Sequence, residues 1–197
     1  EPGGCFEQTS MSSYPNILVR DYLTTIGQSD PKVEARANEL IERGYKKLIA
    51  FETKEKGYEW FGGAPGHEAL TAYGLMQFND MKKVYSGVDQ NMIDRTANWL
   101  MASKDGKGGY KRNARALDNF GGASQNITDA YITYALACAN YENIKMELDH
   151  LYEEAKSPKD AYVMGLAANA LFAYHKDKRA ASILKKKKKK QEADGSF

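Results

Sequence analysis

The segment Leu70-Thr71-Ala72-Tyr73-Gly74-Leu75 decides the fold, because related segments recur further along the chain. They are Thr128-Asp129-Ala130-Tyr131-Ile132-Thr133 and Ala161-Tyr162-Val163-Met164-Gly165-Leu166, each within a stretch of helical spacing. The first two follow a glycine-plus-aromatic turn, Gly57-Tyr58 and Gly109-Tyr110 respectively, which comes after a polar stretch containing lysine. A recurring unit of turn and helix predicts stacked helix pairs, either an open solenoid or a closed α/α toroid.

The rest of the chain also shows helical patterns. Asp30-Pro31 and Ser157-Pro158-Lys159-Asp160 each combine a capping side chain with a proline that suits a first helical turn. Further helices are predicted near residues 14–27, 66–80, 88–103, 127–140, 142–155 and 177–190. No sustained run alternates with the period of a strand, although 58–61 and 109–112 are candidates for short hairpin arms. The sequence therefore predicts an all-α protein.

Both ends of the chain suggest a part of a longer protein. The chain opens at Glu1, and the motif Cys5-Phe6-Glu7-Gln8, discussed below, follows almost at once. At the other end, a last repeat begins at Gly195-Ser196-Phe197 and stops there. We therefore expect residues 1–197 to form a single domain that is truncated at its C-terminus, with helix pairs of a toroid missing.

Composition excludes several classes of function. The 197 residues are 42% hydrophobic, which is enough to build a core. The net charge is +2, but Lys185–Lys190 supply six positive charges, and without them 22 basic residues face 26 acidic ones. A nucleic-acid surface needs basic residues spread over a face, so this balance argues against one. No apolar stretch is long enough to span a membrane, and the three histidines lack paired metal-ligand spacing, so neither a metal nor a cofactor is expected.

Cys5-Phe6-Glu7-Gln8 carries the most specific chemistry. The spacing places a thiol within reach of a side-chain amide across one turn, so that Cys5 could attack the Gln8 carboxamide, release ammonia and form an internal thioester. Glu7 could support this turn by accepting hydrogen bonds from backbone amides, or could be an ordinary surface carboxylate. The other cysteine, Cys138, lies on a stripe of helical spacing and is interpreted as a small buried residue.

These motifs together resemble one family. Gly4-Cys5-Phe6-Glu7-Gln8, followed by Tyr14-Pro15-Asn16-Ile17-Leu18-Val19-Arg20-Asp21-Tyr22-Leu23, is similar to the thioester domain of the alpha-2-macroglobulin and complement superfamily. That family carries Gly-Cys-x-Glu-Gln before a Pro-Asn-Ile-x-Val-x-Asp-Tyr-Leu helix. The resemblance continues in order to about residue 175, through Arg43-Gly44-Tyr45, Trp60-Phe61-Gly62, Leu70-Thr71-Ala72-Tyr73, Gly109-Tyr110-Lys111-Arg112 and Ala130-Tyr131-Ile132-Thr133. Phe6 stands where the vertebrate proteins have glycine, which suggests a bacterial or invertebrate type of member.

The resemblance implies both a fold and a mechanism. The fold would be an α/α toroid of helical hairpins, like that of terpenoid cyclases. In the parent protein, neighbouring macroglobulin and CUB-like domains would cover the Cys5–Gln8 thioester until proteolysis exposes it. An amine or hydroxyl on a protease or a cell surface would then attack the Gln8 carbonyl carbon, and Cys5 would leave as a thiolate. Candidate residues for shielding the bond are Phe6, Met11, Tyr14, Trp60 and Phe61, with ordinary core packing as the alternative role of Trp60 and Phe61.

The same resemblance implies a role and a location. The parent would be a protease inhibitor or an opsonin of innate defence, secreted or held in the bacterial envelope. Each molecule would react once, so the protein would not be an enzyme. Its partners would be the neighbouring domains of its own chain and target proteins or surfaces that bear amines or hydroxyls.

One further residue is implied to select the nucleophile. In the family, a histidine downstream of the thioester directs the acyl group to hydroxyls, whereas aspartate or asparagine leaves direct attack by amines. Aligning Gly109-Tyr110-Lys111-Arg112 with the family's turn puts Asp118 at that position, with Asn119 as its neighbour. None of the histidines His67, His150 and His175 falls there, so we expect a preference for amines. Without the family, Asp118 would be interpreted as a helix or turn cap.

Two other classes of function remain open from the sequence. An enzyme of the cyclase or glycosidase type would require an aspartate-rich metal motif or a catalytic pair of carboxylates, and no Asp-Asp-x-x-Asp cluster is found. A non-reactive protein-interaction module is the other alternative. The presence of Cys5 and Gln8 argues against loss of the thioester by mutation, but not against its hydrolysis.

Overall fold

The computed structural model describes residues 3–113, 123–156, 160–189, 191–192 and 194–195. These residues fall into two compact units. The first unit comprises Glu1–Trp99 and Asn113–Leu117, and the second comprises Leu100–Arg112 and Asp118–Phe197. Each unit is described by itself below.

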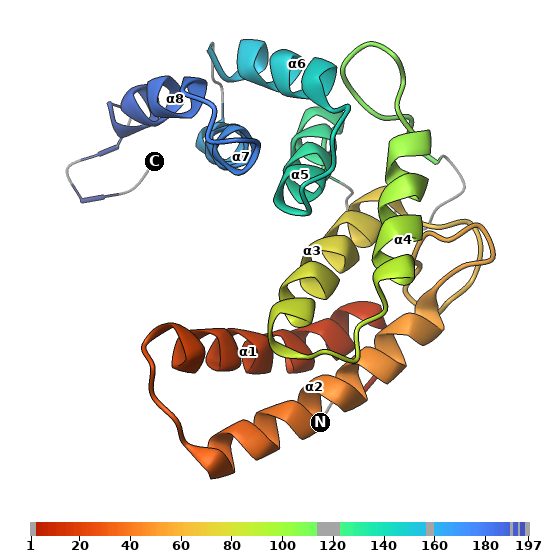
Figure 1. The fold of residues 1–197 in the computed structure, drawn as a ribbon. Helices are drawn as coiled ribbons and strands as arrows, with labels where there is room; N and C mark the ends of the chain where they lie inside the picture. Colours follow the sequence, from red (N-terminus) through yellow and green to blue (C-terminus); the bar gives the residue numbers. More distant parts are fainter. Residues whose placement is uncertain (1–2, 114–122, 157–159, 190, 193, 196–197) are drawn as a thin grey trace. The chain divides into compact units, whose positions relative to one another are not determined.

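The regular elements of the described residues are helices, joined by loops (Figure 1). The elements are α1 (Phe6–Thr25), α2 (Pro31–Leu48), η1 (Ile49–Phe51), α3 (Glu68–Val84), α4 (Gln90–Ala102), α5 (Gln125–Cys138), α6 (Lys145–Lys156), α7 (Ala161–Ala173) and α8 (Arg179–Lys188). In the described ranges the only extended pairing is a pair of isolated antiparallel bridges, Glu52 with Tyr58 and Lys104 with Tyr110. The predicted all-α class is confirmed, and each predicted hairpin arm is reduced to a single bridge.

The start of the first helix differs from the prediction. We expected a helix near residues 14–27. Instead α1 begins at Phe6, with Cys5 as its N-cap, and Pro15 lies inside the helix. Cys5 and Gln8 form a capping box, in which each supplies a side chain to the backbone of the other. Cysteine is not among the usual capping residues, so the sequence did not reveal this start.

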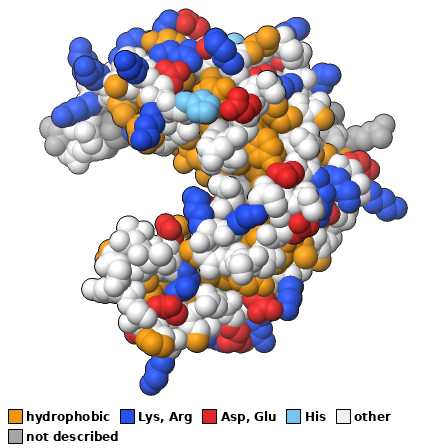
Figure 2. Space-filling view, viewed as in Figure 1, with side chains coloured by type: hydrophobic (Ala, Val, Ile, Leu, Met, Phe, Trp, Pro, Cys, Tyr) orange, Lys and Arg blue, Asp and Glu red, His pale blue; other side chains and the backbone are white. Residues whose placement is uncertain are grey.

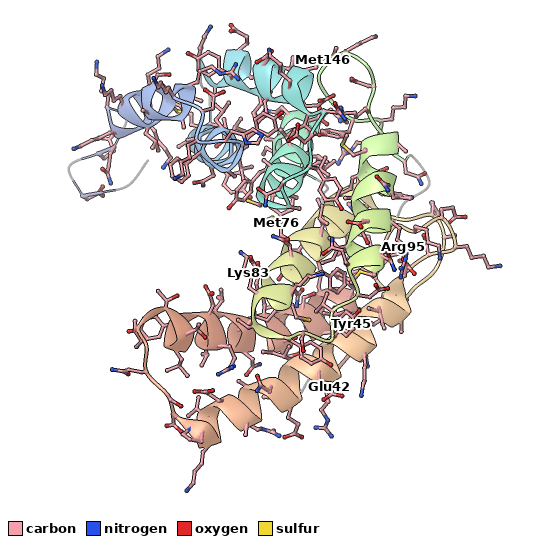
Figure 3. All side chains as sticks on the ribbon, viewed as in Figure 1. Glu42, Tyr45, Met76, Lys83, Arg95 and Met146 are labelled. Atoms are coloured by element: carbon pink, nitrogen blue, oxygen red, sulfur yellow. The ribbon has the colours of Figure 1, made fainter. Side chains whose placement is uncertain are left out.

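The core of the first unit is aromatic. The ring of Phe6, on α1, lies 5.4 Å from that of Tyr58 between ring centroids, and Tyr58 lies 5.3 Å from Phe78 on α3. Tyr45, which extends from α2 (Figure 3), adds an edge-to-face contact with Phe78 at 6.2 Å. Gly74 leaves room for this cluster, since a Cβ there would lie 3.0 Å from Cζ of Phe6. Burial of these rings holds α1, α2 and α3 together.

The second unit is built around α7, which packs against α5, α6 and α8. Its apolar residues Met164, Ala167 and Leu171 are fully buried. At the start of α8, the Arg179 guanidinium binds Asp177 at 2.7 Å and Asp149 at 2.6 Å, and it lowers the pKa of Asp177. Beyond this point lysine side chains gather over the end of α8, at the upper left of the view (Figure 2).

The predicted repeat corresponds to a repeated set of hydrogen bonds. In the first unit, Thr53 N donates to Gly57 O at 2.8 Å and Tyr58 N donates to Thr71 Oγ1 at 2.8 Å. In the second unit the corresponding bonds join Asp105 N to Gly109 O at 3.0 Å and Tyr110 N to Asp129 Oδ1 at 3.2 Å. The two acceptors, Thr71 and Asp129, occupy the same place in the repeated segment, each directly before an Ala-Tyr pair. Each glycine-tyrosine turn is therefore hydrogen-bonded to the helix that follows it.

Replacing Thr71 with valine tests this fastening. The Thr71→Val variant keeps the shape of the side chain but leaves the buried Tyr58 amide without its acceptor, so we expect a loss of about 1–3 kcal/mol in the free energy of unfolding. Urea denaturation of the two proteins measures the difference.

Thr128→Val is the matched control. Thr128 is also a buried helical threonine, and its Oγ1 has no hydrogen-bond partner within the described residues. We expect this variant to be as stable as the wild type or more stable. Equal losses in the two variants would contradict the assigned role of Thr71.

Candidate functional site

The structure brings the Cys5 and Gln8 side chains to the same helix start. Cys5 adopts an extended conformation, with φ −74° and ψ 179°, and Gln8 is the third residue of α1. The Cys5 amide donates to Gln8 Oε1 at 3.1 Å, so the carboxamide folds back over the turn toward the residue that carries the thiol. A thiol and a carboxamide held across one turn can react within the chain at a high effective concentration.

Gly4 makes this close approach possible. Its φ is +79°, a conformation that residues with a Cβ rarely adopt. A Cβ at Gly4 would overlap Gln8 Oε1 and would lie 2.8 Å from Cδ, the carbon that the thiol would attack. Glycine is therefore required both for the backbone conformation and for the room that the carboxamide occupies.

The turn is attached to the first unit on both sides of Cys5. Phe6 N donates to Trp60 O at 2.9 Å, and the Phe6 side chain is fully buried beside Phe51 and Tyr58. On the other side, Thr9 Oγ1 donates to Gly3 O at 3.2 Å. The Cys5 backbone is thus fixed, while its side chain is partly exposed and Gln8 is exposed.

The candidate shielding residues have different surroundings. Phe6 points into the core and anchors the turn, so it does not lie over it. Met11 and Phe61 are 73% and 75% exposed. Tyr14 donates from its hydroxyl to Asp80 Oδ2 at 2.6 Å, and the Trp60 ring packs edge-on against His67. Only Met11 and Phe61 of this set present a largely free apolar side chain to an incoming partner.

Glu7 is an exposed residue in the first turn of α1. A negative charge there is favourable to the helix dipole. Within the described residues no backbone amide donates to its carboxylate, so the structure places it as a surface group. This charge also acts on Tyr73. Burial raises the pKa of the Tyr73 phenol, and the negative charge of Glu7 raises it further.

Asp118 and its neighbour Asn119 lie outside the described residues. Of the histidines, His67 caps α3, with Nδ1 accepting from Leu70 N at 3.3 Å. In the part of the chain that the structure covers, no group of three or more His, Cys, Asp or Glu side chains could hold a metal ion. No helix in that part is long and apolar enough to cross a membrane.

The sequence did not reveal two functional features of this site. The contact between Gly4 and the Gln8 carboxamide was missed, although the pair Gly3-Gly4 was a signal for an unusual backbone. The Trp60 carbonyl was also missed, because a backbone atom of a distant loop leaves no mark in the residue pattern.

Comparison with known proteins agrees with the motif. A family model described as the A-macroglobulin TED domain matches residues 1–197. Thioester-containing protein 1 allele R1 of Anopheles gambiae is 25% identical over 179 residues, which cover 86% of this chain and 13% of that protein. The venom factor of Crotalus adamanteus is 26% identical over 192 residues, covering 87% of this chain and 12% of that protein.

A solved structure shows the same fold. The native conformation of E. coli alpha-2-macroglobulin matches with a TM-score of 0.72 at 20% identity, over 97% of this chain and 12% of that one. The chain therefore spans about an eighth of the length of these relatives.

Gly4→Ala tests the geometry of the turn. The added Cβ would displace the Gln8 carboxamide from the Cys5 amide and would strain the backbone. We expect a loss of about 2 kcal/mol in the free energy of unfolding, from the strain and from the lost cap together. The Cys5 amide resonance should shift as its acceptor is lost.

Gly27→Ala separates the two effects. Gly27 also has a positive φ, +65°, but a Cβ there would meet no atom within 4 Å. Its loss of stability should come from strain alone and should be about 1 kcal/mol. If both variants lose the same amount and the Cys5 amide does not shift, Gly4 does not hold the carboxamide in place.

Proposed function

The chain belongs to the thioester (TED) domains of the A-macroglobulin family, and from this premise we propose that Cys5 and Gln8 form an internal thioester that transfers the Gln8 acyl group to a target. One observation carries the proposal. The Gln8 carboxamide is folded back onto the Cys5 amide, in a turn that leaves no room for a side chain at Gly4.

The chemistry has two steps. In the first, Cys5 Sγ attacks Gln8 Cδ, a C–S bond forms and the C–N bond breaks, and the thiol proton passes to the nitrogen, which leaves as ammonia. In the second, a nucleophile on the target attacks the same carbon, the C–S bond breaks and Cys5 leaves as a thiolate, which then takes up a proton. A thiolate is a far better leaving group than an amide nitrogen, so the acyl group is stored in an activated form.

The neighbouring domains of a longer parent protein would protect this bond. Cys5 is only partly buried by the described residues, and a thioester survives where water is excluded. The exposed side chains of Met11 and Phe61, on α1 and on the loop that holds its start, suit an apolar contact with a covering macroglobulin or CUB-like domain. Proteolysis of the parent would remove the cover and expose the thioester.

The biological role that fits this chemistry is covalent trapping of proteases or tagging of surfaces, by a protein that is secreted or held in a cell envelope. Because the thioester is consumed when it reacts, each molecule would act once and would not turn over as an enzyme. Asp118 at the selecting position would favour amines over hydroxyls. The alternative of an enzyme of the cyclase or glycosidase type is not favoured, since the family match covers the whole chain.

Mass spectrometry of position 8, with and without methylamine, tests the proposal. An intact thioester lowers the mass of the chain by one ammonia. Methylamine should convert Gln8 to its methylamide and release one thiol at Cys5. If the bond has already been hydrolysed, position 8 should carry glutamate, which also records that a thioester had formed.

Cys138 serves as the internal control, because its reactivity toward a thiol reagent should be the same before and after methylamine. Cys5→Ala should abolish every change at position 8. Unmodified Gln8 and a freely reactive Cys5 in a freshly made wild-type chain would contradict the proposal. A protein-interaction module would then be the better interpretation.

A further inference from the structure

Glu59 is a buried carboxylate that organises the loop beside the Cys5–Gln8 turn. Its side chain is 5% exposed, and its Oε2 accepts from Phe61 N at 2.7 Å and from Gly63 N at 3.0 Å. Its other oxygen, Oε1, is buried and has no hydrogen-bond partner within the described residues. Two hydrogen bonds, donated by backbone amides of one loop to a single oxygen, fix the path of residues 59–63.

One of these bonds acts on the peptide group that holds the start of α1. The N–H of Phe61 and the C=O of Trp60 belong to the same planar peptide and point in opposite directions. Glu59 binds the N–H end, and the C=O end accepts from Phe6 N at 2.9 Å. The orientation of the Trp60 carbonyl is therefore set by Glu59.

The Cys5–Phe6 peptide is hydrogen-bonded at both ends in the same way. The N–H of Phe6 is in one plane with the C=O of Cys5, which accepts from Thr9 N at 2.9 Å. A continuous series thus runs from the Glu59 carboxylate through two peptide groups into the first turn of α1. Each bond in such a series polarises the next, and a charged acceptor at one end strengthens them all.

The second unit provides an internal comparison. Glu59 N donates to Phe51 O at 3.3 Å, and the corresponding Lys111 N donates to Ser103 O at 2.7 Å. The two turns have the same backbone frame, but the second unit has a lysine in place of the glutamate. A lysine side chain accepts no hydrogen bond, so the frame itself does not require the carboxylate. The carboxylate occurs in the unit whose loop supports the Cys5–Gln8 turn.

We propose that Glu59 is a positioning residue of the Cys5–Gln8 turn, acting through the Trp60–Phe61 peptide on the backbone of Cys5 and Phe6. The part of this proposal that concerns reactivity rests on the proposed thioester chemistry. The part that concerns the hydrogen-bonded series does not, so the two can fail separately.

The test uses Glu59→Gln and Glu59→Ala in the full 197-residue chain. Glutamine keeps an oxygen for the Phe61 and Gly63 amides but removes the charge, whereas alanine removes the acceptor. We expect hydrogen exchange at the Phe6 amide to become roughly tenfold faster in Glu59→Gln, as a charge-assisted series becomes a neutral one, and faster still in Glu59→Ala. The fraction of chains that have reacted at position 8, as thioester, methylamide or glutamate, should fall in the same order.

Glu68 supplies matched controls, Glu68→Gln and Glu68→Ala. It is also 5% exposed and also accepts from a backbone amide, that of Asn113 at 2.6 Å, but its amide partner does not belong to the thioester turn. These variants should lose similar global stability and should leave both Phe6 exchange and reaction at position 8 within about twofold of the wild type.

Each result decides one part of the proposal. Unchanged Phe6 exchange in Glu59→Gln and Glu59→Ala overturns the positioning role, as does an equal acceleration in the Glu68 variants. If the wild type itself never reacts at position 8, the proposed function fails, and Phe6 exchange alone then decides the role of Glu59. If Glu59→Ala does not fold, Glu59→Gln still gives both measurements.

Discussion

The hydrogen bond from the Phe6 amide to the Trp60 carbonyl is the interaction on which the rest of the site depends. A helix start has four amides without partners inside the helix, and those of α1 follow directly after Cys5. Binding the first of them to a loop of the same unit fixes the helix start in place. Burial of the Phe6 ring among Phe51 and Tyr58 then prevents the turn from lifting away.

This constraint reconciles two opposed requirements. The proposed reaction requires the Cys5 and Gln8 side chains to be both accessible and close together, and both are at least partly exposed. The structure meets both by fixing the backbone and leaving the side chains accessible. The aromatic core holds Phe6, the loop carbonyl holds its amide, and Gly4 leaves the space over the turn to the carboxamide.

The parts of the molecule that could be predicted from sequence are those with local or periodic causes. The cap at Asp30 appears as expected, because a carboxylate that accepts amides of its own first turn is a short-range feature. At the second such motif we expected Asp160 within the first turn, whereas Asp160 is itself the N-cap of α7 and accepts from Tyr162 N. The start of α1 could not be predicted, since Cys5 is an unusual cap. The anchoring role of Phe6 was also hidden, because its partners Phe51 and Tyr58 are far along the chain and only tertiary packing brings them together.

The repeat shows what the fold requires and what it leaves free. Thr71 and Asp129 both accept from the amide of the turn tyrosine, although one is a neutral hydroxyl and the other a carboxyl. Burial raises the pKa of Asp129, while the bonds from Gln125 and the Tyr110 amide oppose that shift. The fold therefore requires an oxygen at this place, whether or not that oxygen is charged.

At the position after the tyrosine the two units differ more, since one has Glu59 and the other has Lys111 on the same backbone frame. Because the frame is formed without the carboxylate in the second unit, the carboxylate in the first is best explained by the Cys5–Gln8 turn that its loop supports.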